Sequence, residues 1–238
     1  MLSYIKLFLI IIHTIIHSVL ALLFAVLDRS YHLYFKLSKS FSWGVLFLGG
    51  VKLKITGMEN IEKGKPYIFV SNHSSQFDIP TLQLAFPNET SIVYKKELGK
   101  IPLFGWQMKL GPYVMIDRDN RESAARSIEN ARKIMAEKGR SILLFAEGTR
   151  SKTGEVQPFK RGAFYLAVKA GYPIVPVSIS GAEKILPKGK FAIKGGTITV
   201  HFDKPITTDN IQTKKDELEL MERVRQIIIA HRNTESIS

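Results

Sequence analysis

Residues 67–86, YIFVSNHSSQFDIPTLQLAF, combine a strand pattern, a polar loop and a helical pattern in direct succession. The run YIFVS has the aromatic and β-branched composition of a strand, and Pro80 suits the first turn of a helix. Asp78 stands just before Pro80, where a carboxylate can accept backbone N–H groups, so we expect it to cap this helix. A strand followed closely by a helix is a common unit of α/β proteins.

The same alternation continues along the chain. Further strands are expected at 51–57, 90–96, 113–117, 141–148, 174–181 and 197–205, with a shorter strand-like piece at 191–195. Helices are expected at 123–138, 162–170 and 216–230. Because no repeat, low-complexity tract or long linker interrupts this order, residues 51–238 are predicted to form one domain. The expected fold class is α/β, with a mixed, largely parallel central sheet flanked by helices.

Composition restricts the partners and the chemistry. The chain has 34 Lys and Arg against 21 Asp and Glu, a formal charge of +13, which favours nucleic acid, an acidic membrane surface or phosphorylated substrates as the partner. The chain has no cysteine, so it has no disulfide, no thiolate nucleophile and no cysteine-based metal site. Any covalent intermediate would need another nucleophile.

The first 27 residues contain a membrane segment. Residues 7–27 are mainly apolar, carry no formal charge except any that His13 and His17 acquire, and are long enough to cross a hydrocarbon core, which takes about 20 residues. A signal peptide fits less well than an uncleaved anchor, because its apolar core is shorter and no small-x-small site precedes Asp28. His13 and His17 share one helical face, which favours a polar stripe against a second helix or the interface over a metal or catalytic role.

Residues 30–49 mix aromatic side chains with Lys36 and Lys39, as is typical of a lipid headgroup boundary. Residues 1–50 are therefore predicted to be a membrane-anchoring helical segment, an N-terminal hydrophobic hairpin that enters one leaflet or spans the bilayer. The positive charge is then interpreted as attraction to anionic membrane lipids, worth about 1 kcal/mol per basic residue near the surface. Nucleic acid is not expected as a partner, because no zinc-finger spacing or RNP signature accompanies the basic charge.

His73 and Asp78 are the first candidates for chemistry. Five residues apart in one helix they would point about 140° away from each other, but they can meet if His73 lies in the loop and Asp78 at the helix entrance. Asp78 would then accept a hydrogen bond from one ring nitrogen and leave the other to take a proton from a substrate hydroxyl. Taken alone, this spacing fits a loop histidine beside a capping aspartate better than a catalytic pair.

A second polar cluster follows the strand expected at 141–148. The sequence Ala146-Glu147-Gly148-Thr149-Arg150-Ser151 places a carboxylate and a guanidinium in a glycine turn, at the kind of strand end where α/β proteins bind ligands. Phe159-Lys160-Arg161-Gly162 then opens a helix whose basic side chains and free amides favour a phosphate.

Together these clusters resemble the four-block signature of the glycerolipid acyltransferase superfamily, the PlsC-type 1-acyl-sn-glycerol-3-phosphate acyltransferases. The first block, NHxxxxD, is matched by Asn72, His73 and Asp78. The second resembles residues 111–118, with Gly111 one residue farther from Arg118 than is usual and Met115 in place of the common Phe. The third block, EGTRS, is present at 147–151, and the fourth, an apolar run around a proline, resembles 174–177. The resemblance spans roughly residues 52–205.

The resemblance implies a role for each matching residue. His73 is the general base and Asp78 orients it, while the acceptor oxygen attacks the acyl thioester directly. Arg118, Glu147 and Arg150 bind the glycerol phosphate, with Glu147 acting through a hydroxyl or by holding an arginine. The implied substrate-binding set is Lys96, Arg118, Glu147, Gly148, Thr149 and Arg150. For Lys96 alone, a solvated surface charge is the favoured interpretation.

The resemblance also implies the reaction, which moves a fatty acyl chain from acyl-CoA or acyl carrier protein to the sn-2 hydroxyl of lysophosphatidic acid (1-acylglycerol-3-phosphate), giving phosphatidic acid. No cofactor or metal is expected beyond the acyl thioester as cosubstrate. Residues 51–238 would be the catalytic domain, on the cytoplasmic face of a bacterial-type inner membrane. Three alternatives stay open: a lysolipid acceptor without glycerol phosphate, an ester or thioester hydrolase, which is disfavoured because no GxSxG motif is present, and a non-enzymatic lipid-binding protein.

Overall fold

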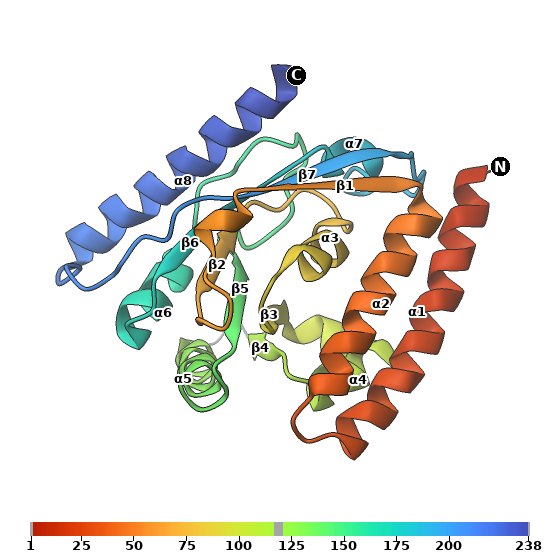
Figure 1. The fold of residues 1–238 in the computed structure, drawn as a ribbon, viewed down its shortest axis with the longest axis horizontal. Coiled ribbons are helices and arrows are strands. Elements are labelled where there is room, and N and C mark those ends of the chain that lie inside the picture. The colour runs from red at the N-terminus through yellow and green to blue at the C-terminus, as the bar shows by residue number, and fades with distance from the viewer. Residues whose placement is uncertain (1, 117–120, 238) are drawn as a thin grey trace.

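A computed structural model describes residues 2–116 and 121–237, without the side chains of 121–125 and 233–237. A seven-stranded sheet lies between two layers of helices, as Figure 1 shows. The strands are β1 (Val51–Thr56), β2 (Ile68–Ser71), β3 (Thr90–Lys95), β4 (Val114–Ile116), β5 (Ser141–Phe145), β6 (Ile174–Ser180) and β7 (Gly196–Phe202). Their spatial order is β1-β7-β6-β2-β5-β3-β4, and every neighbouring pair is parallel except β6 and β7. The predicted mixed, largely parallel α/β sheet is confirmed.

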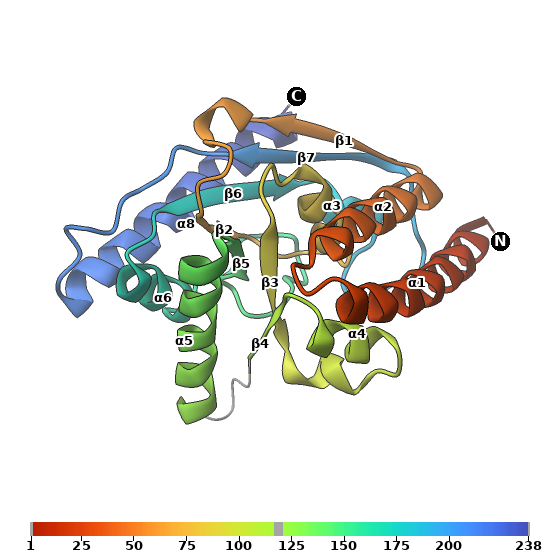
Figure 2. The same ribbon diagram turned by 60° about the horizontal axis from the view of Figure 1, so that its bottom comes forward.

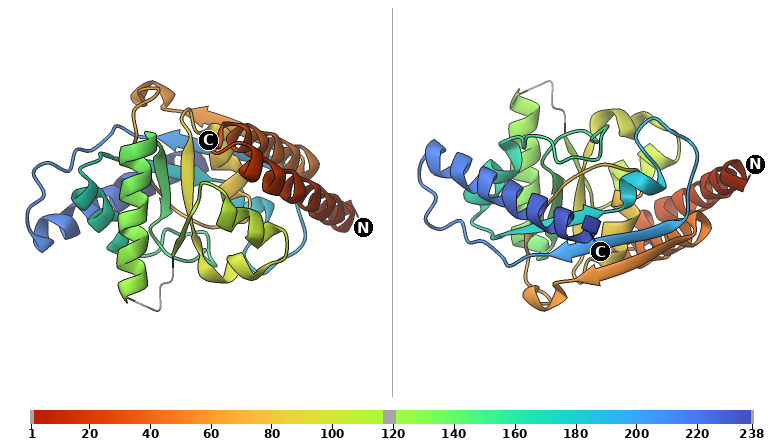
Figure 3. Two further views of the ribbon diagram at one scale, coloured as in Figure 1. Left: turned by 90° about the horizontal axis from the view of Figure 1, so that it is seen from below. Right: turned by 90° about the horizontal axis from the view of Figure 1, so that it is seen from above.

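Helices cover both faces of the sheet. They are α1 (Leu2–Leu27), α2 (His32–Gly49), α3 (Asp78–Ala85), α4 (Phe104–Leu110), α5 (Arg121–Lys138), α6 (Gly162–Ala170), α7 (Ala182–Ile185) and α8 (Lys214–Ile237), with 3₁₀ turns η1 (Met58–Asn60) and η2 (Lys96–Lys100). Residues of α2, α3 and α7 pack on one face, and residues of α5, α6 and α8 pack on the other. Figure 2 shows α5 and α4 from below the sheet, and the right panel of Figure 3 shows α8 crossing the structure from above.

The central strands are apolar on both sides because both faces are covered. In β2, Phe69 points into the cluster under α2 and α3, while Ile68 and Val70 point into the cluster under α6 and α8. All three side chains are fully buried. This is why β2 reads as a continuous apolar run and not as an alternating one.

The strand-like piece expected at 191–195 is wrong, because β7 begins only at Gly196. The neighbouring strand β1 begins at Val51, directly opposite Gly196, so the residues before Gly196 have no strand to pair with. Ile193 is nevertheless buried in the core, which accounts for the apolar pattern of this segment. The short helices α4 and α7 were not expected from the sequence.

The two N-terminal helices form the expected hairpin, which is joined at Asp28 and packed against the body of the protein. Asp28 accepts hydrogen bonds from the backbone N–H groups of Ser30 at 2.9 Å and Leu33 at 2.8 Å, which closes the turn. His13 contacts the backbone carbonyl of Phe41 in α2 at 3.1 Å, as the polar-stripe interpretation expects. The helices approach so closely here that a Cβ at Gly44 would lie 2.4 Å from the His13 ring.

Within the described residues, α1 is the helix with the length and apolar composition needed to cross a membrane. Most of its large apolar side chains are exposed, Leu7 and Ile10 pack partly against the core, and only Ser18, Ala21 and Ala25 are buried. The exposed rings of Trp43 and Phe47 on α2 stack at a centroid separation of 5.2 Å. The hairpin therefore presents a large apolar surface away from the sheet.

Candidate active site

The two polar clusters meet because the strands that precede them are neighbours. Strands β2 and β5 are parallel, and Ser71 at the end of β2 is in register with Phe145 at the end of β5. The loops that leave these two strands therefore begin side by side at one edge of the sheet. The side chain of Asn72 fixes the first loop to β6, accepting a hydrogen bond from Ile179 N at 2.8 Å and donating one to Ile179 O at 3.0 Å.

His73 and Asp78 form a close pair in this structure. His73 Nδ1 lies 2.7 Å from Asp78 Oδ2, and the aspartate side chain is fully buried. An ionised carboxylate only accepts hydrogen bonds, so Nδ1 carries the proton and Nε2 keeps its lone pair. The imidazole stacks on the ring of Phe145, with centroids 3.9 Å apart, and its side chain retains 16% exposure. This arrangement can accept a proton from a group that approaches Nε2.

The expected capping role of Asp78 is wrong in one respect. Asp78 is the first residue of α3 and does not cap that helix through its side chain. Its Oδ2 accepts the backbone N–H groups of Ser74 at 2.7 Å and Ser75 at 2.8 Å, in the loop before the helix. The same oxygen that contacts the imidazole thus also fixes the loop that carries it.

Glu147 is buried, with 3% of its surface exposed, and its carboxylate is directed at the backbone. Oε1 accepts the N–H of His73 at 2.7 Å, and Oε2 accepts the N–H of Gln157 at 3.2 Å. Burial raises the pKa of Glu147 to about 7, although these two hydrogen bonds act in the opposite direction. The sequence motif identified this residue, but it gave no sign that its partner is the amide of His73.

The rest of the EGTRS block forms a turn that contacts His73 through Ser151 and leaves polar groups at the surface. Gly148 adopts a left-handed φ of 75°, and Ser151 N donates to His73 O at 2.7 Å. Thr149 is exposed and Arg150 is partly exposed. Lys188, which sequence reasoning missed, donates to Arg150 O at 2.6 Å and to Thr149 Oγ1 at 3.3 Å. Its only sequence signal is the basic stretch PKGK at 187–190.

The other residues that the sequence predicted for the site are Lys96, Arg118 and the basic residues at the entrance of α6. Lys96 is exposed and begins the turn η2, next in the chain to β3. Arg118 lies outside the described residues, so its position relative to His73 stays a prediction. Arg161, at the entrance of α6, forms an ion pair with Glu217 of α8 and lies over the Tyr165 ring, so its guanidinium is engaged with α8 and α6.

An apolar cavity of about 110 Å³ lies between the helical hairpin and the sheet. Helices α1, α2, α3 and α4 all contribute to its wall. Ile79 and Gln83 enter it from the helix that begins with Asp78, and Phe104 and Met108 enter it from α4. The cavity therefore borders the helix that carries the aspartate of the His73–Asp78 pair.

Comparison with known proteins defines the class. Residues 52–180 match the family model described as Acyltransferase, which is more than half of the chain. The match includes both His73 and Asp78 and the whole EGTRS block. The chain belongs to this acyltransferase family.

Several of its similar relatives are 1-acyl-sn-glycerol-3-phosphate acyltransferases. The enzyme of that name from Saccharomyces cerevisiae is 36% identical over 76% of this chain, and the one from Limnanthes douglasii is 37% identical over 70%. These alignments cover 59% and 58% of the relatives, so the matched part is less than two thirds of their length. The crystal structure of the 1-acyl-sn-glycerophosphate acyltransferase PlsC from Thermotoga maritima aligns with a TM-score of 0.83 and 25% identity, covering 100% of this chain and 95% of that one.

Proposed function

We propose that this protein transfers a fatty acyl chain from acyl-CoA or acyl carrier protein to the sn-2 hydroxyl of 1-acylglycerol-3-phosphate, giving phosphatidic acid. The observation that carries the proposal is the contact of 2.7 Å between His73 Nδ1 and the buried Asp78 Oδ2. It occurs within a chain whose relatives bear the name of this activity.

The proposed mechanism needs one proton acceptor and no covalent enzyme intermediate. As the acceptor oxygen attacks the thioester carbonyl, His73 Nε2 removes its proton, and Asp78 stabilises the resulting imidazolium. The oxygen–acyl bond forms and the carbon–sulfur bond breaks. The leaving thiolate then accepts the proton from His73, which restores the neutral imidazole. A general base of this kind contributes about 10² to 10⁴ in rate, with positioning and charge stabilisation supplying the remainder.

We propose that the phosphate of the acceptor binds at the surface of the EGTRS turn. Arg150 offers a forked guanidinium there, and Gly148 and Thr149 line the same turn. Lys188 adds a second cation, since its ammonium group contacts this turn. Arg118 and Lys96 are proposed as further phosphate ligands. The buried contacts of Glu147 support a role in holding His73 for that residue.

The apolar cavity and the helical hairpin support a lipid substrate. The wall of the cavity is formed partly by α1 and α2, the same helices whose outer surface suits a hydrocarbon core. We propose that the acyl chain enters from the bilayer along the hairpin, because the cavity beneath the hairpin borders the helix of Asp78. We place the catalytic domain on the cytoplasmic face of a bacterial-type inner membrane, where the net charge of +13 favours contact with anionic lipids.

Two serines beside His73 speak against the hydrolase alternative. Ser74 and Ser75 are 1% and 0% exposed, and the hydroxyl of Ser75 donates to the backbone carbonyl of Leu186 at 2.9 Å. Neither is presented to a substrate as a nucleophile.

The experiment that tests the proposal is an assay of the purified full-length protein with both thioester donors. The acceptor panel contains lysophosphatidic acid, lysophosphatidylcholine, monoacylglycerol and a lyso-ornithine lipid. Formation of phosphatidic acid that is lost in His73→Ala supports the proposal. Free fatty acid as the sole product would favour the hydrolase, transfer to another acceptor alone would change the substrate, and no turnover with any pair would favour the lipid-binding protein.

A further inference from the structure

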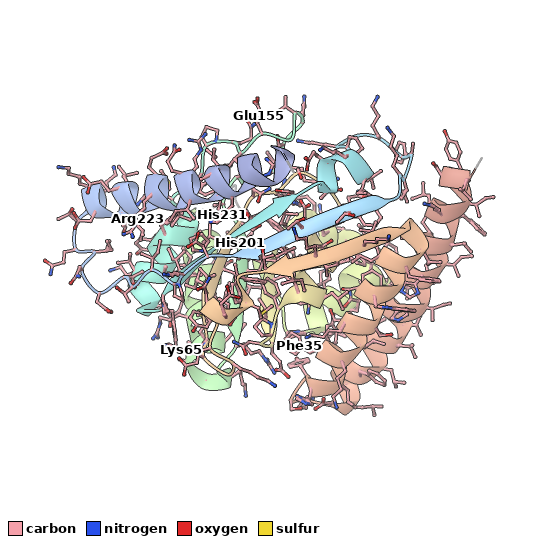
Figure 4. All side chains as sticks on the ribbon, turned by 45° about the horizontal axis from the view of Figure 1, so that its top comes forward. Phe35, Lys65, Glu155, His201, Arg223 and His231 are labelled. Atoms are coloured by element: carbon pink, nitrogen blue, oxygen red, sulfur yellow. The ribbon has the colours of Figure 1, made fainter. Side chains whose placement is uncertain are left out.

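Two histidines and an aspartate that the proposed reaction does not use converge beneath the C-terminal helix. His201 lies on β7, Asp203 follows directly after that strand, and His231 lies on α8. One candidate ligand atom from each residue lies within 4.8 Å of the other two. Figure 4 shows His201 and His231 close together, between the end of β7 and the helix α8.

We propose that this cluster is a binding site for a divalent transition-metal ion of the Zn²⁺ type. Imidazole nitrogen and carboxylate oxygen are the ligands that Zn²⁺ takes in proteins without cysteine, commonly as three protein ligands with one position left for water. A cluster that contains two imidazoles is a poor match for Mg²⁺ or Ca²⁺, which prefer oxygen ligands.

The geometry needs only side-chain adjustment to hold the ion. His231 Nε2 already lies 2.8 Å from Asp203 Oδ2. The rings of His201 and His231 are stacked, with centroids 3.9 Å apart and an interplanar angle of 25°. Tetrahedral ligands at about 2.0–2.1 Å from zinc are roughly 3.3 Å from one another. Because an imidazole binds a metal in the plane of its ring, one of the two stacked rings must turn about χ2, and the ligand atoms that are now up to 4.8 Å apart must move closer together.

A hydroxyl orients one of the imidazoles. Thr56 Oγ1, on the neighbouring strand β1, lies 2.9 Å from His201 Nδ1. Metal-bound histidines usually contact a polar group through the ring nitrogen that does not bind the ion, which fixes the tautomer. This contact assigns Nε2 of His201 as the ligand atom.

The site is accessible and joins separate elements of the fold. The side chain of His231 is 38% exposed and that of Asp203 is 23% exposed, so an ion can enter from solvent. A bound ion would connect β7 to α8 close to Arg232, whose guanidinium donates to the backbone carbonyls of Ile179 and Gly154. Metal binding should therefore stabilise the attachment of α8 to the sheet and to the loop that follows the EGTRS block.

The test uses untagged, full-length protein in detergent micelles, stripped of metal with a chelator and then dialysed. Zn²⁺ binding is measured by competition with a chromophoric chelator, and Co²⁺ is used as a spectroscopic probe of the ligand set. We expect one ion per chain and a thermal midpoint that rises by at least about 2–4 °C when Zn²⁺ is in excess.

The variants His201→Gln, Asp203→Asn and His231→Gln each remove one ligand and keep a polar side chain of similar size. Loss of a residue that only orients a metal ligand weakens metal binding by roughly 10- to 100-fold. Each of these variants should weaken Zn²⁺ binding by more than that and should abolish the rise of the thermal midpoint. The matched control is His17→Gln, because His13 and His17 are a second histidine pair at a spacing that can chelate an ion. Unchanged affinity in the three variants, loss of binding in the control alone, or no saturable binding to the wild type would each overturn the proposal.

Discussion

Glu147 Oε1 accepts the backbone N–H of His73 at 2.7 Å, and the carbonyl of the same histidine accepts the N–H of Ser151 at 2.7 Å. The EGTRS block thus holds the main chain of His73 from both sides. Because Glu147 is buried and its second oxygen accepts the N–H of Gln157, we infer that it acts by positioning His73.

Glu147→Gln should lower kcat far more than it raises KM for lysophosphatidic acid. The amide has one accepting oxygen, so one of the two buried N–H groups loses its partner, at a cost of about 1–3 kcal/mol. If the lost hydrogen bond displaces His73 and the whole cost raises the activation free energy, kcat decreases by roughly 5- to 150-fold. The matched control is Glu155→Gln, an exposed carboxylate in the following loop, which should change neither parameter. A rise in KM alone would indicate direct substrate binding by Glu147.

The raised pKa of Glu147 predicts a dependence of stability on pH. Its pKa in the folded protein is about 7, above the ordinary value of 4.5, so the folded state binds this proton more tightly than the unfolded state does. Its contribution to stability is therefore fully present below about pH 4.5 and is lost as the pH rises through 7. At about 1.4 kcal/mol per pKa unit, the difference approaches roughly 3 kcal/mol. As the pH is raised from 5 to 8, the thermal midpoint of the wild type should decrease more than that of Glu147→Gln. Equal changes of the thermal midpoint with pH in the two proteins would contradict the prediction.

The His73–Asp78 pair predicts two different mutant phenotypes. His73→Ala should lower kcat by about 10² to 10⁴ and leave the fold intact, because the imidazole is partly exposed and stacks on a single ring, that of Phe145 at the end of β5. Asp78→Ala should also destabilise the fold, since it leaves the buried N–H groups of Ser74 and Ser75 without an acceptor. Asp78→Asn is the milder test of orientation. Circular dichroism and single-turnover kinetics separate the effects, and wild-type turnover by His73→Ala would exclude a general base at this position.

The sequence predicted the elements whose signals are local. Apolar runs such as YIFVS identified the central strands because these strands are buried on both faces. The NHxxxxD motif likewise predicted that His73 and Asp78 form a pair, and the structure shows their contact. The role of Glu147 was not predictable in this way, since its partner is a backbone amide 74 residues away and a backbone amide has no sequence signature. Lys188 was missed for the same reason, because its partner is the backbone carbonyl of Arg150, 38 residues away in the chain.

Membrane attachment is best tested by point changes on α1. Deletion of residues 1–50 would also remove Val45 and Leu46, which are buried in the core, and would confuse attachment with folding. The double variant Phe8→Lys and Ile16→Lys changes two side chains that point away from the protein. It should shift the protein out of the floating fraction of neutral liposomes at high salt, because each charge costs about 2.5–3.5 kcal/mol at the centre of a membrane helix. The control Leu218→Lys, an exposed apolar residue on α8, should float normally. Quantitative flotation of the double variant would place the anchor elsewhere.

Arg150 is expected to bind the phosphate of the acceptor in the ground state and in the transition state alike. Arg150→Ala should therefore raise KM for lysophosphatidic acid with little change in kcat. Loss of a charge-assisted hydrogen bond of about 1.5–3 kcal/mol corresponds to roughly 10- to 100-fold in kcat/KM. Arg118→Ala should behave in the same way if the resemblance assigns that residue correctly.

Two further comparisons make the assignment of Arg150 specific. Arg150→Lys should recover only part of the loss, because an ammonium group cannot form the two parallel bonds of a guanidinium. Lys152→Ala, which removes an exposed charge two residues away, is the matched control and should leave KM unchanged. Arg150→Ala should also discriminate less against monoacylglycerol, whose hydroxyl stands in place of the phosphate. If KM for the phosphate acceptor and the preference over monoacylglycerol both stay at wild-type values, Arg150 does not contact the phosphate, and the lysophosphatidic acid assignment loses its main support among the described residues.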